Sequence, residues 1–107
     1  MKTTPSVILV SVLVLLSACA PKVNDPADVH AITQSMDAFA KAINAKDARA
    51  SVAMMTDKTG FFEPHMPAMV GKDAVAKFLQ VFFDQFNVEM TPVVVDVRVV
   101  GNLGVMR

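Results

Sequence analysis

Glu63 and His65 form a carboxylate–imidazole pair with a single residue between them. If residues 61–66 are extended, both side chains point to the same side of the chain. Because imidazole titrates near neutral pH, this spacing predicts an acid–base dyad, with either residue as the base. The alternative is a surface loop between Pro64 and Pro67 in which both groups are solvated. Two candidate ligands do not complete a tetrahedral sphere, so we expect neither a metal nor another cofactor.

Methionine and phenylalanine supply the side chains that could surround an apolar ligand. The sequence contains eight Met and seven Phe but no Tyr or Trp. Met is flexible and polarizable, so a Met-rich interior suits an adaptable pocket, although plain core filling explains the same composition. The predicted pocket residues are Met55, Phe62, Met66, Met69, Phe82, Phe86 and Met90.

Asp96 and Arg98 are a second charged pair, within a strand predicted for residues 93–100. Alternation puts the pair on one face of that strand and only valines on the other. The valine face is expected to pack on the helices, which favours an exposed pair over a charged site inside a pocket. The inward residues are then Val93, Val95, Val97 and Val99.

The composition indicates one small domain. The chain has 107 residues, with ten basic residues balanced by ten acidic ones. This balance offers no basic surface for nucleic acid, so we expect no nucleic-acid partner. A single cysteine, Cys19, excludes an internal disulfide.

The first predicted helix begins at Asp25 and Pro26, a capping residue followed by proline at the first helical position. It ends at Asn44–Lys46, and Asp47 caps a second, shorter helix that we expect to reach Met55. The apolar face of the first helix consists of Val29, Ile32, Met36, Phe39 and Ile43.

A third predicted helix follows the turn at Gly71 and is unusually apolar. More than half of its circumference is apolar, so we expect other segments to wrap it on most sides, with Phe82 among the most buried residues. Its main stripe is Val75, Phe78, Leu79, Phe82 and Phe86, widened by Val81 and Phe83. After the strand at 93–100, Gly101-Asn102 predicts a hairpin turn into a return strand over 103–106.

Residues 1–18 resemble a bacterial lipoprotein signal peptide. Lys2 precedes an apolar run over 7–16, which is shorter than the roughly 20 residues of a membrane-spanning helix. Leu16-Ser17-Ala18-Cys19 resembles the lipobox, the cleavage motif that ends in the cysteine to be lipidated. The alternative is an ordinary signal peptide with a chance cysteine.

The lipobox resemblance implies cleavage before Cys19, lipidation of its sulfur and acylation of the new amino terminus. The membrane is then a partner of the chain through Cys19, because several acyl chains together bind a bilayer stably, whereas a single acyl chain binds only marginally. Ala20 after the cysteine favours the outer membrane, facing the periplasm. Residues 19–24 are the lipidated cysteine and a short tether, and residues 25–107 are the domain.

Over residues 28–107 the chain resembles SnoaL-like proteins of the NTF2-like superfamily. The matching stretches are Ala42-Ile43-Asn44-Ala45-Lys46-Asp47 with Met54-Met55-Thr56-Asp57, the spaced pattern from Phe62 through Pro64, Pro67 and Val70-Gly71-Lys72-Asp73-Ala74-Val75 to Phe78, and Gly101-Asn102-Leu103-Gly104-Val105. These motifs mark turns and packing rather than chemistry. The resemblance implies an α+β fold, a curved antiparallel sheet wrapped on three N-terminal helices to form a cone around an apolar pocket.

Family members usually continue through two further long strands, so the resemblance implies a cone without its last strands. It leaves three functions open: binding of a small apolar or amphipathic molecule, an isomerase, cyclase or hydratase activity using Glu63 or His65, and protein association. The strand predicted at 103–106 would expose an open edge, which favours a homodimer.

Overall fold

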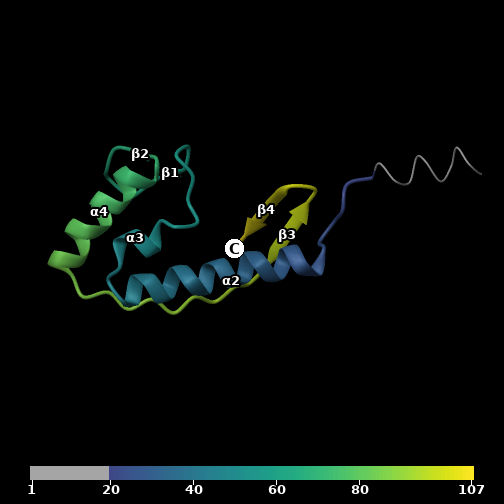
Figure 1. The fold of residues 1–107 in the computed structure, drawn as a ribbon, viewed down its shortest axis with the longest axis horizontal. Coiled ribbons are helices and arrows are strands. Elements are labelled where there is room, and N and C mark those ends of the chain that lie inside the picture. The colour runs from purple at the N-terminus through teal and green to yellow at the C-terminus, as the bar shows by residue number, and fades with distance from the viewer. Residues whose placement is uncertain (1–19) are drawn as a thin grey trace, which may run out of the picture.

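The computed structural model describes residues 20–107, and within that range the chain is α+β, as expected (Figure 1). Cys19 and the signal peptide lie outside the described residues. The strands form two separate antiparallel pairs, β1–β2 and β3–β4. In chain order the elements are α2 (Pro26–Asn44), α3 (Ala48–Ser51), β1 (Gly60–Phe61), β2 (Met69–Val70), α4 (Lys72–Gln85), β3 (Val97–Val100) and β4 (Leu103–Met106).

Helix α2 begins and ends where the sequence predicts. The Asp25 side chain accepts a hydrogen bond from the backbone N–H of Ala27 at 3.0 Å, and Pro26 occupies the first turn. Asp47 caps α3 in the same way by accepting from Ala50 N–H at 2.9 Å. The expectation that this second helix reaches Met55 is wrong, because α3 ends at Ser51 and gives way to a turn.

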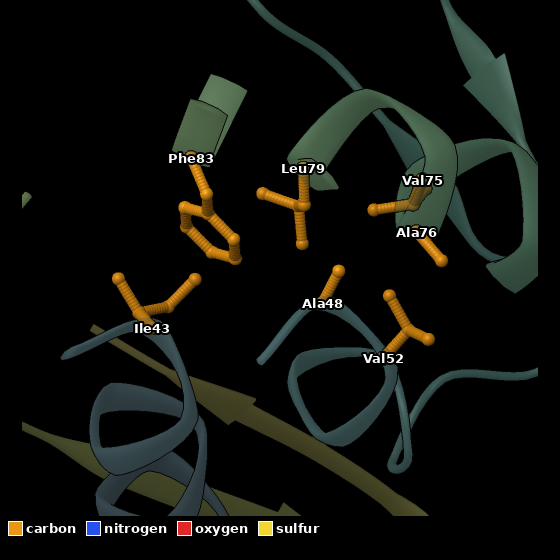
Figure 2. Packing of buried hydrophobic residues seen from close by; sticks show 7 residues of the cluster. All are labelled: Ile43, Ala48, Val52, Val75, Ala76, Leu79 and Phe83. Atoms are coloured by element: carbon orange, nitrogen blue, oxygen red, sulfur yellow. The ribbon is translucent and has the colours of Figure 1, made fainter. Parts of the chain in front are cut away.

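The buried core lies where the end of α2 meets α3 and α4 (Figure 2). Small side chains on α3 and α4, such as Ala48 and Ala76, let the two helices approach closely. We call this cluster the helical core; its members are Ile43, Ala48, Val52, Val75, Ala76, Leu79 and Phe83.

Phe83, not Phe82, is the phenylalanine of α4 at the centre of the core. Phe83 is only 3% exposed, whereas Phe82 is half-buried. Phe82 lies on the neighbouring face of the helix, with its ring 6.0 Å from that of Phe78 and 5.0 Å from that of Phe86. Helix α4 is also not wrapped on most sides, since Val81 and Phe86 are exposed. Because apolar residues occupy more than half of its circumference, the sequence could not select the face that α3 covers.

Gly71 makes the turn into α4, as predicted. Its φ of 88° lies in the left-handed region, and a Cβ there would stand 3.1 Å from the carbonyl oxygen of Asp57. Just before it, β2 pairs with β1 in the register Gly60↔Val70 and Phe61↔Met69. This short pair closes the loop over residues 62–68.

The hairpin predicted at Gly101-Asn102 is confirmed. Strands β3 and β4 pair from Val97↔Met106 to Val100↔Leu103, and Gly101 takes the positive φ of 59°. Within β3 the alternation also holds, because Val99 is buried and Arg98 is exposed.

The strand predicted to begin at Val93 is wrong over residues 93–96, which form no strand. Val93 and Val95 are exposed rather than packed inward. A β-branched sequence forms a strand only where a neighbouring strand pairs with it, and the paired register of the hairpin ends at Val97↔Met106. Beyond it, the backbone groups of Val95 and Asp96 bond only to the backbone of Arg107.

One face of the hairpin packs on α2. A Cβ at Gly104 would stand 2.5 Å from Cδ1 of Ile32, so only glycine fits there without a shift of the Ile32 side chain. Figure 1 shows the hairpin over the first half of α2, while α3, α4 and β1–β2 gather at its other end.

Residues 22–24 do not behave as a free tether. Val23 forms a β-bridge to Val100, and Gly101 N–H donates to the Lys22 carbonyl at 2.8 Å. Asn24 N–H donates to the Val99 carbonyl at 2.8 Å, and Val99 N–H donates to the Asn24 side chain at 2.9 Å. The predicted tether therefore ends at Lys22, and the Val23–Val100 bridge joins the chain to the edge of β3 that β4 does not occupy.

Over residues 20–107, none of the helices is both long and apolar enough to span a bilayer.

Candidate functional site

Glu63 and His65 lie in the loop that joins β1 to β2, not on an extended segment. The carbonyl of Glu63 accepts from Met66 N–H at 3.2 Å, which closes a turn, and His65 has the left-handed φ of 64°. Alternation of side chains therefore does not apply to this pair. Glu63 is half-buried and His65 is exposed, and no hydrogen bond or ion pair joins them. Glu63 and His65 are close in sequence, but the turn does not join their side chains into a dyad.

The predicted pocket residues divide into two groups rather than lining one cavity. One group is half-buried and packs against the helical core: Met55, Met69, Phe82 and Met90. The other group is exposed: Phe62, Met66 and Phe86. The first group fills the rim of the core, which is the plain core-filling alternative for a Met-rich sequence.

An apolar depression of about 230 Å³ lies between α2, the segment after α4 and the end of β4. Three methionines from distant parts of the sequence meet there, and of these only Met90 belongs to the predicted pocket. We call it the methionine depression; its lining residues are Met36, Met90, Pro92, Val93, Val94, Met106 and Arg107.

Asn44 positions one wall of the methionine depression, because it fixes the segment that follows α4. Its side chain donates to the Met90 carbonyl at 2.9 Å and accepts from Met90 N–H at 2.6 Å. The two bonds satisfy both backbone groups of Met90, so residues 90–94 run along α2 without forming a strand. Met36 and Met90 are thereby brought to the same side of α2.

Arg107 closes the other end of the methionine depression. Its backbone is held by an N–H bond to the Asp96 carbonyl at 2.9 Å and by an N–H bond from Val95 at 2.8 Å. Arg107 adds a cationic residue to an otherwise apolar lining, and an arginine can bind the anionic end of a molecule whose body is apolar. The depression therefore suits an amphipathic ligand better than a purely apolar one.

A second surface hollow, of about 490 Å³, is lined by Asn44, Asn87, Val88 and Glu89. Three of these four residues are polar, so the hollow offers fewer apolar side chains to a ligand than the methionine depression does. We assign no ligand to it.

Asp96 and Arg98 form the exposed pair that the sequence favours. The guanidinium Nε of Arg98 donates to Asp96 Oδ2 at 2.9 Å, and Arg98 is largely solvent-exposed. A pair in such a position contributes little to stability and lies outside any cavity. It serves the hairpin surface rather than a site.

The part of the chain from residue 20 onward contains no group of three or more His, Cys, Asp or Glu side chains able to hold a metal ion.

Sequence reasoning missed Met36, Met106 and Asn44 as site residues. The periodicity of α2 places Met36 on its apolar face, but nothing in the spacing connects residues 36, 90 and 106. For Asn44, the sequence indicates only the end of a helix. An amide side chain at a helix end can both donate to and accept from the backbone of another segment, and this is the signal that could have drawn attention to Asn44.

No family model matches the chain, and no curated protein matches it.

Proposed function

We propose that the chain is a lipid-anchored protein of the bacterial cell envelope that binds a small amphipathic molecule in the methionine depression. The observation that carries the proposal is that Met36, Met90 and Met106 line one depression together with Arg107. Flexible thioethers adapt to an apolar chain, and the cation fixes its polar end. The lipobox at Leu16–Cys19 supports the anchor and Ala20 supports the outer membrane.

The proposal includes a distant relation to the SnoaL-like domains of the NTF2-like superfamily. Two features support it: the sequence motifs and the packing of α2 on one face of an antiparallel hairpin. In the NTF2-like cone the ligand lies between helices and sheet, which is the position of the methionine depression. The separate pairing of β1–β2 and β3–β4 departs from a single curved sheet.

An isomerase, cyclase or hydratase activity has weaker support. Glu63 and His65 are not among the residues that line the methionine depression. A catalytic base must come within hydrogen-bond reach of the bound molecule. Binding without turnover is therefore the function that we propose.

Ligand binding can be tested on residues 20–107 by native mass spectrometry with fatty acids and lysophospholipids as probes. Met36→Gln should weaken binding about tenfold, because part of an apolar side chain stabilises a ligand by about 1.5 kcal/mol. Met54→Gln is the matched control, since Met54 is exposed and lies outside the depression. The proposal is wrong if no probe binds or if both variants weaken binding equally.

A second candidate function, association with another copy of the chain, is favoured by the outer edge of β4. The hairpin register and the Asp96–Arg107 backbone bonds direct residues 103, 105 and 107 toward β3. The N–H and C=O groups of Gly104 and Met106 therefore point away from β3. In the described part of the chain no strand pairs with this edge.

Pairing of two β4 strands about a two-fold axis would place Val105 opposite Val105 of the second copy and join Gly104 to Met106. Val105→Lys should abolish such a dimer, because two like charges would then face each other. Val70→Lys, at another exposed valine, should leave it intact. Sedimentation over a concentration series decides: a monomeric wild-type protein excludes this association.

A further inference from the structure

The β3–β4 hairpin and the bridge residue beside it carry a row of exposed apolar side chains. Val23 is paired with Val100 by the β-bridge, and Val100 is paired with Leu103 across the hairpin. Residues directly opposite each other in a sheet project to the same face. Their exposed fractions are 64%, 52% and 68%. We call Val23, Val100 and Leu103 the outer row.

The outer row lies on the face of the hairpin that α2 does not cover. Gly104 and Val99 face α2, as the close approach of Gly104 to Ile32 and the burial of Val99 show. Alternation then places Val100 and Leu103 on the opposite face. Val105 and Arg98 continue this face as the next pair of the register, and both are exposed.

The described chain starts one residue after Cys19, and the distance from Cys19 to the sheet is short. Lys22 is already fixed by its bond from Gly101 N–H at 2.8 Å. Three extended residues reach at most about 10 Å. A lipid on Cys19 would therefore hold Lys22, and the Gly101 backbone bonded to it, within about 10 Å of the bilayer surface, with the outer row directly beside them.

We propose that the outer row is a membrane-docking surface, which contacts a phospholipid bilayer once Cys19 is acylated. This inference rests on the proposed lipid anchor and goes beyond it, because an anchor alone leaves the domain free to tumble. Apolar side chains so close to the anchor lose their water by entering the interface.

Two cations flank the outer row and suit the same partner. The side chains of Lys22 and Arg98 are each 79% exposed, although each also contacts a carboxylate, Asp25 and Asp96 respectively. Cations near apolar side chains favour anionic phospholipid head groups. The docked orientation leaves α4 and the loop of residues 62–68 at the other end of the molecule, away from the bilayer (Figure 1).

The natural chain has no Trp, so a single introduced Trp reports on its own surroundings. We would prepare the full-length protein with Leu103→Trp in bacteria and purify it as the acylated mature form. It is then placed in vesicles of phosphatidylethanolamine and phosphatidylglycerol whose acyl chains carry bromine, a quencher. Phe86→Trp is the matched control, because Phe86 is exposed at the end of α4.

We expect the emission of Leu103→Trp to shift to shorter wavelength and to lose intensity in brominated vesicles, with no such change for Phe86→Trp. Equal quenching of the two variants overturns the docking surface. A shift without quenching also overturns it, since a protein surface rather than lipid would then cover the outer row. Intact-mass measurement keeps the two proposals apart, because a chain without acyl groups on Cys19 overturns the anchor itself and the docking with it.

Discussion

The helical core and the β3–β4 hairpin use apolar residues in opposite ways. The core joins α2, α3 and α4 around seven buried side chains and leaves its remaining phenylalanines at the rim. The hairpin buries Val99 against α2 but exposes Val100, Leu103 and Val105. A closed cluster stabilises the fold by itself, whereas a two-stranded sheet with apolar side chains on both faces has only half of its surface covered. Stability therefore resides at one end of α2, and exposed apolar surface lies at the other.

The sharpest test of this contrast is Phe83→Ala in the helical core. We expect it to lower the free energy of unfolding by about 3–5 kcal/mol, the usual range for a buried phenylalanine. Since a small domain is stable by only about 5–15 kcal/mol, much of the protein should unfold near room temperature. Phe82→Ala is the matched control and should have a clearly smaller effect in thermal unfolding. An equal or larger effect of Phe82→Ala would show that the core is not centred on Phe83.

A smaller change is expected at the contact between the hairpin and α2. Gly104→Ala puts a methyl group against Cδ1 of Ile32 and should destabilise hairpin docking by about 1 kcal/mol. Hydrogen exchange should accelerate in β3 but not in α4. Ile32→Val removes the colliding atom, so the double variant should recover the protection. If the two substitutions prove additive, the contact does not set the position of the hairpin.

Asn44 connects the two regions, and its removal should lower stability by about as much as Gly104→Ala or by slightly less. Asn44→Ala breaks both hydrogen bonds to the Met90 backbone. Each of these exposed neutral bonds should contribute about 0.5 kcal/mol, the low end of the usual range, so that together they contribute about 1 kcal/mol. Asn87→Ala, which removes an acceptor for Lys46 at 2.7 Å, is the control. Denaturant unfolding monitored in each region separately should show the two transitions diverging only for Asn44→Ala.

The smallest expected effect concerns acid. The hydrogen bond from Ala27 N–H, aided by nearby Lys22, holds the pKa of Asp25 below its usual value. A lowered pKa in the folded state stabilises the protein above the pKa of an unfolded aspartate, and this stabilisation disappears as the pH falls through the lowered value. Asp25→Asn should flatten that part of the pH dependence of unfolding. An Asp25 resonance that titrates at or above the usual aspartate pKa in NMR would contradict it.

Local chemistry was sufficient to predict where elements begin and turn. Asp25, Asp47, Gly71 and Gly101 each act within a few residues of themselves, by capping a helix or taking a positive φ. Such interactions depend little on the rest of the fold, so the sequence carries them directly.

Burial and pairing could not be predicted in the same way. The choice between Phe82 and Phe83 depends on where α3 approaches α4, and residues 93–96 lie beyond the paired register of the hairpin, which ends at Val97↔Met106. The methionine depression needs residues from α2, from the segment after α4 and from β4 to meet in space. Spacing along the chain holds no information on such meetings, which tertiary contacts alone decide.

The hydrogen bonds that hold residues 22–24 against β3 affect the order in which the chain folds. The bond from Val99 N–H to the Asn24 side chain joins residues 75 positions apart, whereas the contacts of the helical core span shorter stretches. Long loops close late, because their entropy must be lost before the contact forms. During synthesis residues 22–24 thus have no strand to join until β3 has emerged. If Cys19 is acylated as we propose, the modifying enzyme would meet this segment before the hairpin holds it, and the hairpin contacts would then bring the anchor close to the sheet.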